Sequence, residues 1–239
     1  MNIIIPMAGE GSRFLKNQYL PKPLIDVNGK PMIVRAIESL GLDGQYYFII
    51  RQNEYTHIVE EIISKVVHNP RFIEITQTTN GPACSALLFK DNIDNDEELI
   101  IANCDQIMEW STSLFLHNSR LYDGAVVTYY SDTDKNSYAR IDKNGYVSEI
   151  REKEVISNIS LNGIHYWKKG KYFVKSAEEM IADDDRAPNG EFYIAPTYNY
   201  MIKDKLKIGI HHIPNECHHA VGVPIDLERF LKHENSKTQ

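Results

Sequence analysis

The sequence predicts an α/β fold, in which a mostly parallel, Rossmann-like mixed sheet is flanked by helices within a single domain. Three observations predict it. Short apolar runs alternate with amphipathic helical segments through the first half of the chain. A glycine-rich loop directly follows the first apolar run. After Gly124, several strand-like runs lie close together and would complete the sheet. The 239 residues are enough for one domain with a hydrophobic core.

The first half is expected to alternate between strands and helices. Strands are predicted over residues 2–6, 46–50, 71–76 and 99–102, and helices over 33–40, 55–67 and 83–89. Pro31 stands just ahead of the first helix, where the fixed φ of proline suits a helix start. Because such alternation produces parallel strands, ligands are expected at the carboxyl ends of the strands.

The second half has a different pattern, with strand-like runs in succession. Strands are predicted over 125–130, 138–141, 146–151, 160–167 and 206–213, and helices over 172–181, 192–202 and 227–231. The run Asp142-Lys143-Asn144-Gly145 predicts a hairpin turn. The polar tail from His233 is expected to be frayed.

Composition excludes several classes of function. The formal net charge of -7 argues against nucleic acid as a partner, since a phosphate backbone needs a surplus of Lys and Arg. No stretch approaches the roughly 18 apolar residues of a membrane span, and the amino terminus does not have the pattern of a signal peptide. Three scattered cysteines are typical of a reducing compartment, so we expect a cytoplasmic protein without a membrane partner.

The loop Met7-Ala8-Gly9-Glu10-Gly11-Ser12-Arg13 carries the strongest chemical signal. Its two glycines let the backbone approach a polyphosphate closely, so that N–H groups can point at the oxygens. Arg13 would add a fork of donors. By itself the motif fits an ordinary turn equally well, and it matches neither the dinucleotide fingerprint nor the P-loop.

A second motif follows shortly, in which Pro21 and Pro23 bracket Lys22 and stiffen the backbone around it. Gly29-Lys30-Pro31-Met32-Ile33 comes next. With these motifs the chain resembles the sugar-phosphate nucleotidylyltransferases over nearly its whole length. The resemblance implies transfer of a nucleotide from an NTP to a sugar phosphate or polyol phosphate, with Mg²⁺ as cofactor and release of pyrophosphate. The resemblance divides the single domain, 1–239, into an NTP-binding half (about 1–123) and an acceptor-binding half (about 124–232). It leaves open whether the protein forms a homodimer.

The resemblance also implies the residues of the nucleotide site. They are Met7, Ala8, Gly9, Gly11, Ser12, Arg13, Lys22, Gln77, Gly81, Pro82, Ala83 and Asn103. Gln77 and the tight segment from Gly81 suit a pyrimidine base, so CTP, UTP and dTTP are the expected donors. Asp105 resembles the aspartate that binds Mg²⁺ at a strand end, although in isolation it would be interpreted as a turn or cap residue.

The second half carries the residues that the resemblance implies for the acceptor. They are Tyr138, Ala139, Glu152, Lys153, Asn162, Gly163, Glu191 and Tyr193. Two positions depart from the pattern of many relatives. Ala220 stands where a second metal-binding aspartate is usual, which leaves Asp226 as a candidate ligand that could equally be a helix N-terminal residue. Glu154 replaces a proline.

The implied reaction is in-line attack by an acceptor phosphate on the α-phosphorus of the NTP. A phosphate monoester is mostly dianionic at pH 7, so no general base is required. Arg13, Lys22 and Asp105 are therefore the expected catalytic residues, acting through charge and position. Two alternatives remain: a glycosyltransferase of the same fold, against which the missing D-x-D motif argues, and a non-catalytic nucleotide-sensing module.

Two histidine pairs, His211-His212 and His218-His219, look like a metal cluster at first sight. Adjacent residues of a strand point to opposite faces, so the members of a pair should not converge on one ion. A structural role is therefore the expected one.

Overall fold

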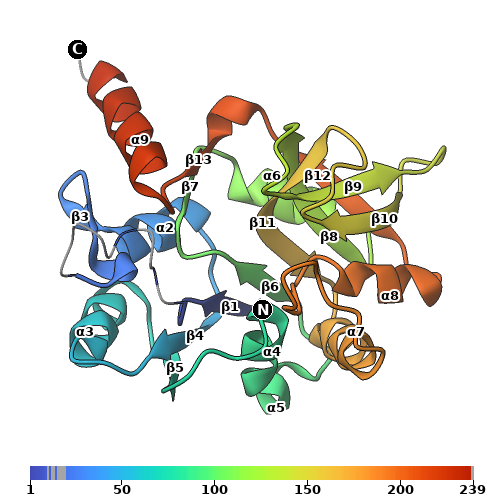
Figure 1. Cartoon of the computed structure of the whole chain (residues 1–239), viewed down its shortest axis with the longest axis horizontal. Helices are drawn as coiled ribbons and strands as arrows, with labels where there is room; N and C mark the ends of the chain where they lie inside the picture. The colour runs from blue at the N-terminus through green and yellow to red at the C-terminus, as the bar shows by residue number, and fades with distance from the viewer. Residues whose placement is uncertain (10, 12–13, 15–19, 238–239) are drawn as a thin grey trace.

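A mixed β-sheet lies at the centre of the molecule (Figure 1). The structure is a computed structural model that describes residues 1–9, 11, 14 and 20–237. Within this part of the chain, nine strands form the main sheet. They are β1 (Asn2–Pro6), β4 (Gln45–Arg51), β5 (Arg71–Ile75), β6 (Leu99–Ala102), β8 (Gly124–Tyr130), β9 (Ser137–Ile141), β10 (Val147–Glu152), β11 (Ile159–Trp167) and β12 (Ile208–His212).

The first-half strands are parallel and lie in the order β5-β4-β1-β6. β4 flanks β1 on one side and β6 flanks it on the other, so the strand order reverses between β1 and β6. β11 then adds antiparallel to β6, and β8 pairs with β11 and β12. β9 and β10 form the expected hairpin around the Asp142–Gly145 turn. The α/β fold class with a mostly parallel mixed sheet is therefore confirmed.

Helices cover both faces of the sheet. One face carries α2 (Met32–Leu40), α3 (Thr56–Val66) and α6 (Thr112–Ser119). The other carries α4 (Pro82–Ala86), η2 (Leu87–Phe89), α5 (Lys90–Ile93), α7 (Gly170–Ala182) and α8 (Thr197–Lys203). Successive side chains of a strand point to opposite faces, which explains the two layers. Ile3 and Ile5 of β1 pack with the first set of helices, and Ile4 packs with the second.

Several short elements lie outside the main sheet. They are η1 (Lys22–Leu24), β2 (Asp26–Val27), β3 (Lys30–Pro31), β7 (Gln106–Met108), η3 (Asn215–Cys217) and β13 (His218–Ala220). β7 pairs antiparallel with β13, which brings the C-terminal segment next to the strand end that carries Asp105.

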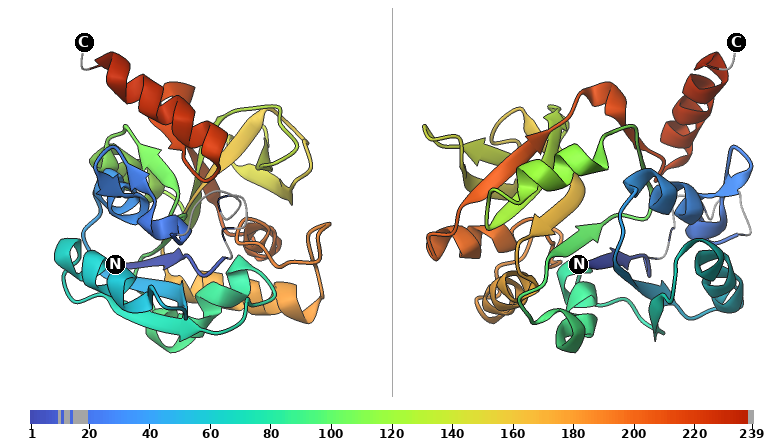
Figure 2. Two further views of the ribbon diagram at one scale, coloured as in Figure 1. Left: turned by 60° about the vertical axis from the view of Figure 1, so that its left-hand side comes forward. Right: turned by 180° about the vertical axis from the view of Figure 1, so that it is seen from behind.

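The C-terminal helix α9 (Pro224–Lys237) is much longer than the predicted helix over 227–231 (Figure 2). Its Leu227 and Phe230 are buried against a third cluster that includes Ile107 and Val221. The frayed tail expected from His233 is therefore wrong up to Lys237, because the helix is anchored by these apolar residues and by polar contacts of His233 and Lys237 with Glu109. α8 also differs, since it begins at Thr197 after Pro196 rather than at 192.

Among the described residues, no helix is long and apolar enough to cross a membrane. Cys84, Cys104 and Cys217 are free thiols. The division into an NTP-binding and an acceptor-binding half stays a prediction.

Candidate active site

The reversal of strand order between β1 and β6 places two loops side by side at the carboxyl ends of these strands. Met7, Ala8 and Gly9 leave β1, and the run Asn103-Cys104-Asp105 leaves β6. Such a switch point is where open α/β sheets bind ligands. Both loops were predicted to bind the nucleotide and its metal. Ser12 and Arg13 lie outside the described residues.

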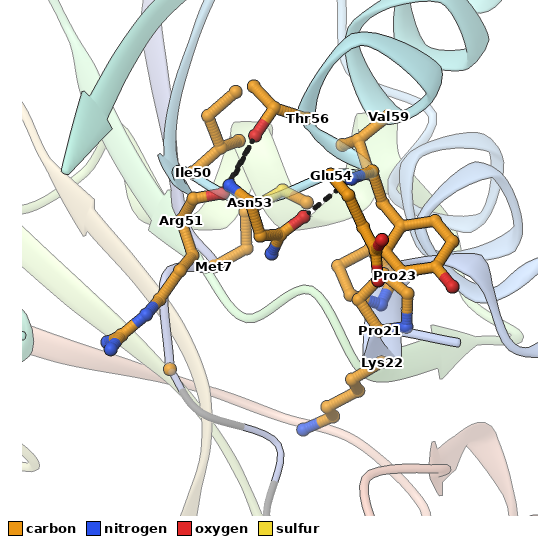
Figure 3. A pocket seen from close by; sticks show the side chains of 12 residues that line it. Met7, Pro21, Lys22, Pro23, Ile50, Arg51, Asn53, Glu54, Thr56 and Val59 are labelled. Carbon is orange, nitrogen blue, oxygen red and sulfur yellow. Dashed lines mark hydrogen bonds between the residues drawn. The ribbon is translucent and has the colours of Figure 1, made fainter. Parts of the chain in front are cut away.

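Lys22 and Asp105 form an ion pair at this point. Lys22 opens the η1 turn between Pro21 and Pro23, and its side chain points away from Asn53 and Thr56 (Figure 3). The side chains of Lys22 and Asp105 are 19% and 23% exposed, so the pair is largely shielded from water. The lysine and the carboxylate that the sequence assigned to phosphate and metal therefore lie together.

The C-terminal segment closes the far side of Asp105. The Val221 N–H donates to the Asp105 carbonyl oxygen at 2.9 Å, and a Cβ on Gly222 would lie 2.1 Å from Asp105 Oδ2. Only glycine fits against the carboxylate there. The stretch around Ala220 thus lies where the resemblance implied, yet it supplies no second carboxylate. Asp226 contacts Arg229 in α9 and lines a different cavity, beside Ala220.

A pocket of about 210 Å³, here called the Gly81 pocket, lies beside the β1 loop. It is lined by Pro6, Ala8, Gly9, Ile75, Thr78, Thr79, Gly81, Pro82, Ser85 and Glu191. Four predicted nucleotide residues therefore share one pocket. Thr79 Oγ1 lies 2.8 Å from the Gly81 carbonyl oxygen and 2.7 Å from Ser85 Oγ, which stiffens the wall.

Gly81 is held against the backbone of Phe192. The Phe192 N–H donates to the Asn80 carbonyl at 2.8 Å, and the Ala83 N–H donates to the Phe192 carbonyl at 3.0 Å. Gly81 has a φ of 131°, and a Cβ there would lie 2.4 Å from the Phe192 oxygen. The wall of the Gly81 pocket is therefore joined rigidly to the segment that carries Glu191 and Tyr193.

A second pocket of about 230 Å³, here called the Asn162 pocket, lies on the β11 side. Its lining is rich in polar side chains: Asn103, Gln106, Lys135, Asn136, Ser137, Glu152, Asn162, His165 and Tyr193, with Pro6, Pro82, Ile101, Leu161, Gly163, Ile194 and Ala195. Four predicted acceptor residues, together with Asn103, line it. Pro6 and Pro82 line both pockets, so the two pockets adjoin.

Glu152 and Lys153 lie at the end of β10. Glu152 accepts a hydrogen bond from Ser137 Oγ, while burial raises the pKa of its carboxyl. Lys153 does not line the Asn162 pocket itself. Its Nζ donates to the hydroxyl of Tyr193 at 2.6 Å and lies 4.6 Å from the centre of that ring. The φ of 56° at Lys153 is unusual for a residue with a side chain, and such backbone strain clusters at functional sites.

Gly163 joins the Asn162 pocket to the loop after β6. Its φ is 93°, and a Cβ would lie 2.1 Å from Asn103 Nδ2. The pairing of β11 with β8 shifts register between Leu161 and His165, which marks a bulge around Asn162 and Gly163. The absence of a Cβ on Gly163 therefore leaves room for the side chain of Asn103, which follows β6.

The remaining predicted residues lie outside the two pockets. Met7 lines the cavity of Figure 3. Gly11 packs against Lys22, because a Cβ on it would lie 3.2 Å from Lys22 Cβ. Gln77 is exposed and does not line the Gly81 pocket. Ala83, Tyr138 and Ala139 are buried in their elements, and the Tyr138 hydroxyl donates to the Thr133 carbonyl at 2.6 Å.

Several polar lining residues escaped the sequence analysis: Lys135, Asn136, Ser137, Gln106 and His165. Gln106 Oε1 and His165 Nδ1 are buried and have no hydrogen-bond partner among the described residues. Burial lowers the pKa of His165 to about 3, so its ring is neutral. Strand alternation from Gly163 would have indicated His165, since residues two apart share a face. Gln106 directly follows Asp105, but nothing in the sequence indicates its direction.

The histidine pairs diverge as predicted. His211 packs on Trp110 and Phe115, whereas His212 packs on Tyr130. His218 packs on Tyr129, whereas His219 packs on Phe230.

The chain has the sugar-phosphate nucleotidyltransferase fold, which confirms the family resemblance of its motifs. A nucleoside-diphosphate-sugar pyrophosphorylase from Vibrio cholerae superposes with a TM-score of 0.86 at 25% identity, over 96% of this chain and 99% of that one. No family model matches the sequence.

Curated relatives extend this likeness. A bifunctional GlmU protein of Methanocaldococcus jannaschii is 26% identical over 231 residues, which are 95% of this chain and 52% of that protein. The chain thus spans about half the length of the GlmU relatives it matches. A 2-C-methyl-D-erythritol 4-phosphate cytidylyltransferase of Thermosipho africanus is 23% identical over 225 residues, 92% of this chain and 96% of that protein.

Proposed function

We propose that this protein transfers a nucleotide from a pyrimidine NTP to a sugar phosphate or polyol phosphate and releases pyrophosphate. One observation carries the proposal: two pockets adjoin at Pro6 and Pro82, and one of them is lined by Asn103 and Gln106, which lie on either side of the ion-paired Asp105 in the chain. A transferase with two substrates needs two adjoining pockets and charge compensation where they meet. The proposal extends to this chain what the names of the pyrophosphorylase and cytidylyltransferase relatives state of those proteins.

In this proposal the NTP base lies in the Gly81 pocket. Its triphosphate runs along the β1 loop, past Gly9 and Gly11 to Ser12 and Arg13. The close contact of Gly81 with Phe192 keeps this pocket narrow, which favours a pyrimidine over a purine. Gln77 is exposed beside this pocket, and we propose that it turns toward the base when the NTP binds.

The acceptor lies in the Asn162 pocket. Gln106 Oε1 and the polar atoms of Asn162 and Glu152 match the hydroxyl groups of a sugar or polyol, since buried acceptors need donors from the ligand. Lys153, which already donates to Tyr193, holds the attacking phosphate at the edge of this pocket.

The residues around Asp105 fit a Mg²⁺ ion held jointly by protein and substrate. One rigid carboxylate at a strand end, supplemented by phosphate oxygens and water, is a normal Mg²⁺ environment. When bound, Mg²⁺ supplies charge neutralisation at the α-phosphate. In this proposal Asp105 exchanges its contact with Lys22 for the ion, and Lys22 contacts the pyrophosphate. Asp226 is the less favoured ligand, because it faces a different cavity.

Pyrophosphate release is the test of the function. CTP, UTP, dTTP, ATP and GTP would each be combined with hexose 1-phosphates and polyol phosphates in the presence of Mg²⁺. We expect release with a pyrimidine NTP and one phosphorylated acceptor. Consumption of a ready-made nucleotide sugar without pyrophosphate would establish the glycosyltransferase alternative, and tight binding without turnover would establish the sensing module. A purine NTP as the best donor would overturn our interpretation of the Gly81 pocket.

A further inference from the structure

Three side chains from three separate segments converge on one point beside the C-terminal half of α9. Glu109 follows β7, His219 belongs to β13 and His233 lies in α9. Glu109 Oε1 lies 3.0 Å from His219 Nε2 and 3.3 Å from His233 Nε2. All three atoms lie within 4.8 Å of one another. No part of the proposed reaction uses these residues.

The spacing matches the ligand shell of a metal ion. Zinc binds imidazole nitrogens and carboxylate oxygens at about 2.0–2.1 Å, and neighbouring corners of such a tetrahedron are then about 3.3–3.4 Å apart. The distances from Glu109 Oε1 to the two histidine nitrogens, 3.0 Å and 3.3 Å, are close to the length of this edge. Two histidines and one carboxylate leave the fourth corner open, as in many zinc sites.

The surroundings hold the carboxylate in position for this role. Lys237 donates to the second oxygen, Oε2, and so holds the carboxylate from its other side. The Glu109 N–H donates to the Cys217 carbonyl at 3.0 Å, which fixes the backbone. Oε1 therefore faces the two histidines, while an outer partner orients the carboxylate, as is usual around metal ligands.

We propose that Glu109, His219 and His233 bind a divalent transition-metal ion of the zinc class, which ties α9 to the β7–β13 pair. Imidazole ligands favour Zn²⁺, Co²⁺ or Ni²⁺, whereas Mg²⁺ prefers oxygen. The site therefore differs in chemistry from the Mg²⁺ position at Asp105. Its role is to fasten the C-terminal helix to the strand that begins directly after Asp105.

Metal titration of the whole chain tests the proposal without any activity measurement. Chelator-treated protein would be titrated with Co²⁺ and followed by visible absorption, and with Zn²⁺ by calorimetry, both in excess Mg²⁺ so that Asp105 is occupied. We expect one ion per chain and the intense absorption of four-coordinate Co²⁺. His219→Ala, His233→Ala and Glu109→Gln should each weaken binding by at least about 100-fold, since losing even an outer-shell partner costs about 10- to 100-fold.

Two variants serve as controls. His57→Ala removes an exposed histidine of α3, and Cys217→Ser removes the nearby thiol; neither should change the affinity. His233 lies on the C-terminal helix and is partly exposed, so its replacement should leave the core folded, which circular dichroism checks. Absence of a one-to-one Co²⁺ complex in the wild type would overturn the proposal. So would equal affinity in His233→Ala and His57→Ala.

Discussion

Lys22 and Lys153 are held in different surroundings, which predicts different substrates for them. Lys22 is bracketed by two prolines beside the β1 loop, whereas Lys153 contacts Tyr193 in the second half of the chain. Each would make a charge-assisted contact worth about 1.5–3 kcal/mol, which corresponds to roughly a 10- to 150-fold effect. We expect Lys153→Ala to raise the acceptor KM and to spare NTP binding. Lys22→Ala should weaken NTP binding or kcat and spare acceptor affinity.

Steady-state kinetics with each substrate varied in turn, together with calorimetric titration of the NTP, would check this division. Tyr193→Phe is a matched variant, because it removes the hydroxyl that Lys153 contacts and keeps the ring. Equal loss of NTP affinity in Lys153→Ala and Lys22→Ala would contradict the division of roles.

Asp105 is expected to carry the metal dependence of the reaction. Asp105→Asn keeps the shape of the side chain and removes the charge that opposes Lys22 and would bind Mg²⁺. We expect kcat to fall by orders of magnitude while the protein stays folded at assay temperature, with some loss of stability because Lys22 loses its partner carboxylate; circular dichroism would check the fold. The wild type in excess chelator should be equally inactive. Full turnover of the variant, or of the chelated wild type, would show that Asp105 holds no required metal ion.

At the scale of elements, the contact between Gly81 and Phe192 joins the two pockets. Gly81→Ala would place a Cβ 2.4 Å from the Phe192 oxygen and impose a positive φ on alanine. Gly145→Ala is the matched control, since its φ is 85° but nothing lies within 4 Å of the added Cβ. The control should lose about 1–2 kcal/mol of unfolding free energy. Gly81→Ala should lose clearly more and also bind NTP weakly.

Denaturant unfolding and NTP titration of the two glycine variants would measure these effects. If both variants lose the same free energy of unfolding and bind NTP alike, the contact with Phe192 does not shape the pocket.

The sequence predicted the elements in which apolar residues recur with a clear strand or helix period. The strand over 2–6 and the helix over 33–40 agree closely with β1 and α2, whose inward residues are almost all buried. α6 was missed because only Phe115 and Ser119 of its residues are buried. α9 was predicted too short because only Leu227 and Phe230 anchor a helix that is otherwise polar. β7 and β13 have three residues each, which is too short for a periodic pattern of apolar residues to be recognised.

The candidate site was predictable where its residues follow one another in the chain. The loops after β1 and β6, the Gly81 segment and the Asn162–Gly163 strand were all found as short motifs, and the fold brings them together. Contacts between distant segments were not predictable. The ion pair of Lys22 with Asp105 and the packing of Gly222 on that carboxylate depend on tertiary structure alone. The contact of His233 with Glu109 and His219 was not predictable either, because these residues lie far apart in the sequence.

At the scale of the whole molecule, the buried His165 and the half-buried His218 make stability depend on pH. Burial lowers the pKa of His165 to about 3 and that of His218 to about 4, from the ordinary value near 6.5. The unfolded chain therefore binds protons below pH 6.5 that the folded chain does not. The stability contribution of the neutral rings is complete above pH 6.5 and is lost as the pH falls toward 4. Each histidine adds up to about 1.4 kcal/mol per pH unit to the slope.

Urea unfolding between pH 4.5 and 7.5 would measure that slope. His165→Gln should reduce the slope of the unfolding free energy against pH by the contribution of one histidine. His57→Gln, which alters an exposed side chain, should leave the slope unchanged. An unaltered slope in His165→Gln would show that this ring is not held neutral.

The β9–β10 hairpin lies at the margin of the sheet, with β10 as the last strand of its path. It carries Ser137 and Glu152 to the Asn162 pocket, yet it makes no strand pairing with β1, β4 or β5, which lie on the opposite side of β6. A marginal hairpin can be lengthened or exchanged without rebuilding the parallel strands. Under the proposed function, acceptor choice is therefore carried in part by a peripheral hairpin, so that exchanging this hairpin would change the acceptor while leaving the parallel strands in place.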